Sequence, residues 1–108
     1  MNTLEDVVDT LICMIKESRT FKEYERTKEL LKQDAELKSK VDAYRAENYK
    51  LQNMEDDGHL GERIERFASD NAYLTDQVVV RQFLDAELAL CRLLQEITGE
   101  IMDSIPLE

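Results

Sequence analysis

The chain's one histidine stands among carboxylates, which is a combination of side chains that can hold a metal ion. His59 lies between Asp56 and Asp57 on one side and Glu62 on the other, with Glu55 just before. Imidazole nitrogen and carboxylate oxygen are both ligands of divalent cations. Their order does not alternate oxygen ligands as a calcium loop does. The 55–62 loop is therefore either a metal- or small-ligand-binding segment or a charged, solvated connection between helices.

Two cysteines are the candidate nucleophiles. Cys13 and Cys91 are each flanked by apolar residues, and neither has a plausible base near it in the sequence. A nucleophilic thiol needs such a base, so we interpret both as reduced thiols inside the core. The sequence also lacks a glycine-rich phosphate loop. We predict no enzymatic activity, no catalytic residue, no metal and no cofactor.

Glu87 falls on an apolar stripe, between Leu84 and Cys91. A carboxylate in such a place is costly unless it is paired. It either contacts an Arg or Lys of a partner protein or is satisfied by a hydrogen bond or ion pair within the chain. An alternative function for the chain is an acidic helical module that binds a metal or a small ligand. Its binding residues would be those of the 55–62 loop or Glu87.

The elements that position these residues are predicted to be helices. The chain has only three Gly and one Pro, too few for the tight turns of a β-rich fold. Apolar spacing and capping residues predict an all-α fold, a helical bundle of about five helices. The third helix and the C-terminal helix are expected to form a long antiparallel hairpin. The expected helices span residues 3–17, 20–33, 34–54, 60–69 and 76–104.

Polar residues mark the expected helix ends. Thr20, with Glu23 three residues later, has the spacing of a capping box. Asp34 and Thr75 are expected to cap the third and the last helix. Residues 1–106 are predicted to form one helical domain. Leu107 and Glu108 are treated as a candidate cloning scar without structural weight.

The last helix carries the strongest signal of a binding surface. Its two apolar stripes together cover more than half of its circumference, so it needs neighbours on two sides. The part left uncovered predicts a homo-oligomer or another protein partner. The third helix has a narrow stripe in which Asn48 is the polar position that sets register. The predicted interface residues are Val80, Leu84, Glu87, Leu88, Cys91 and Leu94 on the last helix, and Tyr44, Asn48 and Leu51 on the third.

The charge of the chain limits its partners. Its net charge is -10, and a surface this acidic repels nucleic-acid phosphates and anionic lipid headgroups. Direct binding to nucleic acid or membrane is therefore not expected. The sequence also shows neither a signal peptide nor an apolar run long enough to span a bilayer. We expect a cytoplasmic protein.

Three segments carry a resemblance to a known family: RTFKEY at 19–24, LLKQDAE at 30–36 and VRQFLDAEL at 80–88, the last followed by an apolar tail to Ile105. From about Val7 to Ile105 the chain resembles the YlbF/YmcA family of small helical proteins of Firmicutes. The resemblance implies a cytoplasmic helical bundle that forms oligomers through helix packing. It also implies a non-enzymatic regulator, because family members assemble with one another and with a further protein.

Through that assembly, family members modulate the endoribonuclease RNase Y and so affect competence, sporulation and biofilm formation. The partners implied here are a second copy of the chain, as a homodimer or higher oligomer, and related family proteins. Some members carry a cysteine-rich C-terminal tail associated with iron–sulfur binding. The present sequence has no such tail, so no iron–sulfur role is expected.

Overall fold

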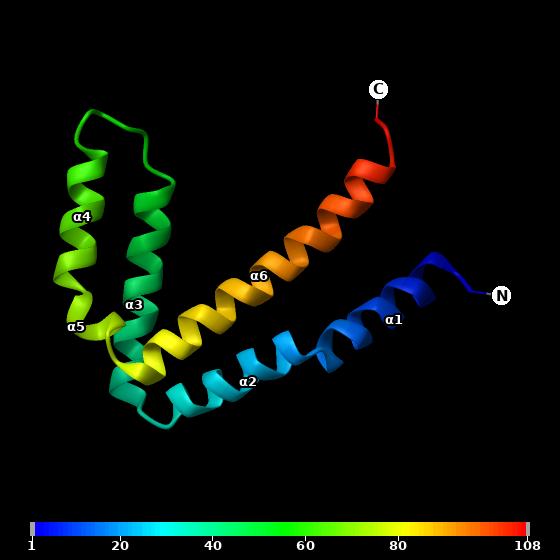
Figure 1. The fold of residues 1–108 in the computed structure, drawn as a ribbon, viewed down its shortest axis with the longest axis horizontal. Helices are drawn as coiled ribbons and strands as arrows, with labels where there is room; N and C mark the ends of the chain where they lie inside the picture. The colour runs from blue at the N-terminus through cyan, green and yellow to red at the C-terminus, as the bar shows by residue number, and fades with distance from the viewer. Residues whose placement is uncertain (1, 108) are drawn as a thin grey trace. The chain divides into compact units, whose positions relative to one another are not determined.

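The computed structural model of the chain describes residues 2–107 and is helical throughout, which confirms the all-α prediction (Figure 1). Met1, in the predicted domain, and Glu108, in the candidate cloning scar, lie outside the described residues. Six helices are present in the part described, and strands are absent there. Their bounds are α1 Leu4–Glu17, α2 Arg19–Lys32, α3 Ala35–Gln52, α4 Leu60–Asp70, α5 Ala72–Thr75 and α6 Val78–Ser104.

Side chains at the helix starts explain two of these boundaries. Thr3 and Asp6 form a reciprocal capping box at the start of α1, with both nitrogen-to-oxygen distances at 3.1 Å. Asp34 caps α3 as predicted, because its Oδ1 accepts a hydrogen bond from the Leu37 amide at 3.0 Å. These bonds satisfy amides that have no partner inside the helix.

The predicted cap of α2 is wrong by two residues. The helix begins at Arg19, and the Phe21 amide donates to the hydroxyl of Ser18 at 3.2 Å. Ser18 also ends α1, where its backbone is extended. The chain thus passes from one helix to the next through a single residue, so Thr20 lies inside α2 and cannot cap it.

The break expected around residues 70–74 is a separate short helix, α5, which raises the number of helices from five to six. Thr75 is the last residue of α5, and its hydroxyl donates to the Asn71 carbonyl at 3.3 Å. Because α6 starts only at Val78, Thr75 is not its cap, and that prediction is wrong as well.

The helices divide into two compact units, and the divisions fall within α2 and α6. Unit 1 holds residues 1–28 and 83–108, and unit 2 holds residues 29–82. Each is described by itself below. The single domain expected over residues 1–106 stays a prediction.

Unit 2 is built around the pair α3 and α4, which lie side by side and are joined by the loop 53–59 (Figure 1). The rings of Tyr44 and Phe67 stack between them, with centroids 5.1 Å apart and planes 13° from parallel. Val41 and Leu74 are buried in this unit. The predicted hairpin is therefore corrected: in unit 2 the neighbour of α3 is α4. Most of α6 belongs to unit 1 instead.

In unit 1, α1 and the first part of α2 run alongside α6 in the opposite direction (Figure 1). Tyr24 of α2 meets Phe83 of α6 with ring centroids 5.8 Å apart. Phe83, Ala86 and Thr27 are the buried side chains here, and the Thr27 hydroxyl donates back to the carbonyls of Glu23 and Tyr24 at 3.0 Å. Packing in unit 1 is thus concentrated where α2 faces the part of α6 that begins at Phe83.

Candidate functional site

Helix α1 is amphipathic but barely covered. None of its fourteen residues, all described, is buried. Leu4 is 82% exposed and Met14 63%. Apolar side chains gain their stabilising free energy only when they leave water. Much of the apolar face of α1 is therefore left exposed by the rest of unit 1. The other large exposed apolar side chains on α1 are Val7, Val8 and Ile12.

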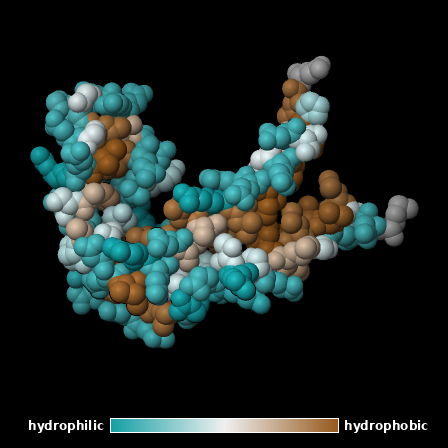
Figure 2. Space-filling model, in the orientation of Figure 1, coloured by the Kyte–Doolittle hydropathy of each residue, from teal (hydrophilic) through white to brown (hydrophobic). Residues whose placement is uncertain are grey.

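The C-terminal half of α6 continues this exposed surface. One of the two predicted apolar stripes of α6 is buried or half-buried; it consists of Val79, Phe83, Ala86, Leu90, Leu93 and Ile97. The other stripe is exposed from Leu88 onward; it consists of Val80, Leu84, Leu88, Cys91, Leu94, Ile101 and Ile105. Leu88 is 49% exposed and Leu94 42%. Ile101, Met102 and Ile105 are also exposed. Figure 2 shows apolar surface gathered over α1 and α6 of unit 1. We call the exposed apolar residues of these helices in unit 1 the α1–α6 surface; they are Leu4, Val7, Val8, Ile12 and Met14 of α1 and Leu88, Leu94, Ile101 and Met102 of α6.

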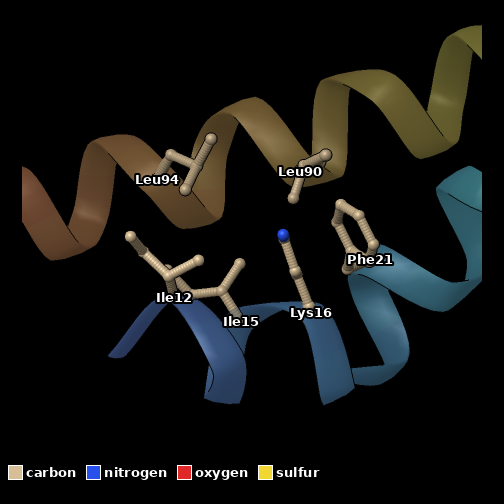
Figure 3. A pocket seen from close by; sticks show the side chains of 6 residues that line it. All are labelled: Ile12, Ile15, Lys16, Phe21, Leu90 and Leu94. Atoms are coloured by element: carbon tan, nitrogen blue, oxygen red, sulfur yellow. The ribbon is translucent and has the colours of Figure 1, made fainter. Parts of the chain in front are cut away.

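A small hollow lies within this surface, between α1, the start of α2 and α6 (Figure 3). Its volume is about 210 Å³. That is below the size of common small-molecule sites, ~300–1,000 Å³, and suits one or two inserted side chains. Its lining residues are Ile12, Ile15, Lys16, Phe21, Leu90 and Leu94.

Lys16 is the one charged side chain in this lining. Figure 3 shows it rising from α1 between Ile15 and Phe21 toward Leu90. It makes no ion pair with any of residues 2–107. Its aliphatic stem can cover apolar neighbours while the ammonium group stays in water. The hollow thus combines an apolar floor with an unpaired positive charge at its edge.

The structure separates the predicted interface residues of the last helix. Val80 is 0% exposed, so it belongs to the core and has no surface to offer a partner; that prediction needs correcting. Leu84 is half-buried, whereas Leu88, Cys91 and Leu94 are exposed. The interface role of these exposed residues stays a prediction.

The predicted interface residues of the third helix lie in unit 2. Tyr44, Asn48 and Leu51 are all half-buried on α3. Tyr44 is occupied by its stack on Phe67 of α4, which is contact within the chain. The interface role of these three residues stays a prediction.

Both cysteines were expected in the core, and both are exposed. Cys13 neighbours an apolar face on a helix that buries nothing. Cys91 belongs to the outward stripe of α6, which includes Leu88 and Leu94. Apolar flanking residues indicated burial in the sequence, but they line a surface here.

Two carboxylates of the 55–62 loop, Asp56 and Asp57, accept hydrogen bonds from the loop and from the start of α4. The Asp57 carboxylate accepts hydrogen bonds from Nη1 and Nη2 of Arg63, at 3.0 and 2.8 Å, and from the His59 amide at 3.1 Å. The hydrogen bond from Arg63 holds the pKa of Asp57 below its usual value. Asp56 accepts from the Gly58 amide at 2.8 Å. Gly58 has φ of 94°, a conformation that favours glycine. These contacts favour the interpretation of a folded charged turn.

Two further findings concern ligands and membranes. Among residues 2–107, three or more side chains of His, Cys, Asp or Glu do not come together in a way that could hold a metal ion. No helix in the same part of the chain is both long and apolar enough to cross a membrane. Glu87, the other candidate of the ligand-binding alternative, is half-buried and already takes part in an interaction.

Sequence reasoning missed the exposed residues of α1. Leu4, Val7, Val8, Ile12 and Met14 do follow helical spacing, but that spacing predicts an inward face. The signal in the sequence that could have identified them is the number of apolar residues on the two helices. α1 and α6 both carry broad apolar faces, and two helices packed on each other cover only one side of each.

The chain is similar to known proteins over nearly its whole length. A model of the family described as control of competence regulator ComK, YlbF/YmcA, matches residues 4–106. A UPF0342 protein of Caldicellulosiruptor bescii is 25% identical over 113 aligned positions, which cover 97% of this chain and 90% of that protein. No solved structure matches the chain.

Proposed function

The chain belongs to the YlbF/YmcA family, described as control of competence regulator ComK, and from this premise we propose that it is a regulator that acts by binding proteins. The α1–α6 surface is the observation that carries the proposal. Exposed apolar patches of this extent, on two neighbouring helices, mark protein-interaction sites. Its hollow suits inserted side chains better than a substrate.

The proposal includes partners, mode of action and place. The chain binds a second copy of itself, related family proteins, or both, and takes no direct part in catalysis. It acts in the cytoplasm, in an assembly that modulates RNase Y-dependent RNA processing and, through it, competence, sporulation and biofilm formation. The net charge of -10 favours contact through protein surfaces over contact with RNA phosphates.

The test is capture of partners from the native cell with three variants of α6. Leu88→Glu and Leu94→Glu each place a carboxylate on the exposed apolar stripe. Ala89→Glu is the matched control, because Ala89 is exposed at a helical angle shared with Asp85 and Glu96. Each variant is first checked for unchanged helicity by circular dichroism.

We expect the two leucine variants to lose family partners and the control to retain them. RNase Y-dependent transcript ends, measured in cells that carry each variant, should change with the leucine variants alone. Full recovery of partners by Leu88→Glu and Leu94→Glu would place the interface elsewhere. Normal transcript ends despite lost partners would remove the link to RNase Y.

A further inference from the structure

We propose that α1 is the contact between two copies of this chain, packed antiparallel, with reciprocal ion pairs between Asp9 of one copy and Lys16 of the other. The inference rests on the proposed self-association and names its interface. Its starting observation is that α1 has an exposed apolar face and no buried residue. A neighbour that covers this face would therefore remove apolar side chains of α1 from water, which is favourable.

The charges along α1 favour a second copy as that neighbour. Glu5, Asp9 and Lys16 are four and seven residues apart. At 3.6 residues per turn, these spacings return to nearly the same edge of the helix, beside Val8 and Ile12. None of the three makes an ion pair with any of residues 2–107. One edge thus carries negative charge at its start and positive charge at its end.

Such an edge complements itself when it is turned around. In a two-fold dimer each contact occurs twice, with residue and partner exchanged. If two α1 helices cross antiparallel near Ile12, Asp9 of each copy lies opposite Lys16 of the other. A parallel two-fold pair would instead place this edge against the other edge of the partner's apolar face, where Val7 and Met14 offer no charge, so neither ion pair could form. The charge pattern therefore selects the antiparallel dimer.

The hollow gives the apolar part of this contact a place. Ile12 and Lys16 both line it, and its floor is formed by Leu90, Leu94 and Phe21 (Figure 3). A second α1 laid over it brings Val8 of the second copy, next to the Asp9 that meets Lys16, above this floor. Burial of such a side chain in a desolvated pocket is typical of interface anchors. The ammonium of Lys16 meanwhile gains the partner that it lacks within its own chain.

The experiment is a charge exchange with mixing. Asp9→Lys and Lys16→Glu each turn both predicted ion pairs into like-charge contacts in a homodimer. When the two variants are mixed, a heterodimer has both pairs restored with opposite signs. Glu17→Lys is the control, because it changes charge by the same amount on the polar side of α1. Molecular mass is followed by sedimentation over a range of concentrations, and helicity by circular dichroism.

We expect a wild-type dimer, roughly tenfold or more weaker self-association in each single variant, and recovery of the dimer in the equimolar mixture. The control should associate like the wild type. A wild-type dimer with no rescue in the mixture would overturn the α1 contact while leaving self-association intact. A wild-type monomer that still captures family proteins would overturn the inference and leave the proposed function standing. A misfolded single variant shows itself by lost helicity, and the double variant Asp9→Lys/Lys16→Glu then replaces it, with dimerisation expected.

Discussion

Asp57 organises the turn between α3 and α4. Its carboxylate accepts hydrogen bonds from Nη1 and Nη2 of Arg63 and from the backbone amide of His59. A bidentate contact of this kind fixes geometry as well as charge. The carboxylate that suggested a metal ligand in the sequence is thus a structural part of the turn.

The pH dependence of this turn follows from the lowered pKa of the Asp57 carboxyl. The Arg63 hydrogen bond lowers the pKa of Asp57 in the folded chain. The contact therefore stabilises the fold fully above the ordinary carboxyl pKa of about 3.9. This stabilisation is lost as the pH falls through the lower pKa of the folded state. Titration of the Asp57 carboxyl carbon by NMR should show a midpoint below the ordinary range. Arg63→Gln should raise that midpoint, whereas Arg66→Gln, a change of a neighbouring arginine, should leave it in place. Equal midpoints in all three proteins would contradict the contact.

Single residues also show what the sequence can and cannot predict. The capping role of Asp34 was predictable, because a cap depends on residues within three positions of it. The burial of Val80 and the exposure of Leu88, Cys91 and Leu94 were not. All four lie on one predicted stripe, and helical spacing identifies an apolar face without saying how far along it the neighbouring helix extends.

Ser18 controls the junction of α1 and α2. Its hydroxyl accepts the Phe21 amide and donates to the Ile15 carbonyl. Ser18→Ala should lower the free energy of unfolding by about 1 kcal/mol, the usual cost of losing a cap. Thr20→Ala should stay within ~0.5 kcal/mol, since Thr20 lies inside α2. Urea unfolding at one fixed protein concentration measures both, and a larger loss from Thr20→Ala would restore the capping box inferred from sequence.

The stack of Tyr44 on Phe67 is the ring contact between α3 and α4. We expect a coupling of about 0.5–1.5 kcal/mol between the two rings, as found for aromatic pairs. The measurement is a double-mutant cycle with Tyr44→Leu and Phe67→Leu, which keeps apolar bulk at both positions. Additive effects of the two changes would show that the rings contribute through burial alone.

Helix pairing was the least predictable part of the fold. The narrow stripe of α3 holds Val41, which is buried, and Tyr44, which stacks on Phe67 of α4. Nothing in that stripe identifies the neighbour, because Phe67 of α4 and the leucines of α6 offer it similar apolar surface. The loop 53–59 is short, and short loops favour pairing of consecutive helices. That rule favours the observed pair over the long hairpin.

At the scale of the molecule, the candidate surface follows from the uneven distribution of apolar residues. The buried side chains Val41, Leu74 and Val80 belong to unit 2, whereas the large exposed apolar side chains of α1 and of α6 after Phe83 belong to unit 1. Two broad apolar faces in one small unit cannot both be covered from within it. The sequence predicted this excess for the last helix. It did not predict that α1 shares it, because the helical spacing of the apolar residues of α1 predicts an inward face.

The proposed self-association would make the stability of unit 1 depend on protein concentration. A helix of fourteen residues is marginal in water without tertiary contacts, and α1 buries none of its residues. Self-association that covers α1 stabilises it by mass action, so the stability becomes concentration-dependent. We expect slower hydrogen exchange of the α1 amides and a higher unfolding temperature as protein concentration rises.

Hydrogen exchange followed by mass spectrometry at low and high micromolar concentration can test this, with unit 2 as the internal control. Amides of α3 around the buried Val41 should exchange at the same rate at both concentrations, because their packing lies within the chain. Amides of α1 should lose protection on dilution, and those of α6 beyond Leu88 should follow them if the two helices are covered together. Protection of α1 that does not change with concentration would mean that contacts within one chain suffice to hold it, and that its apolar face awaits a different protein.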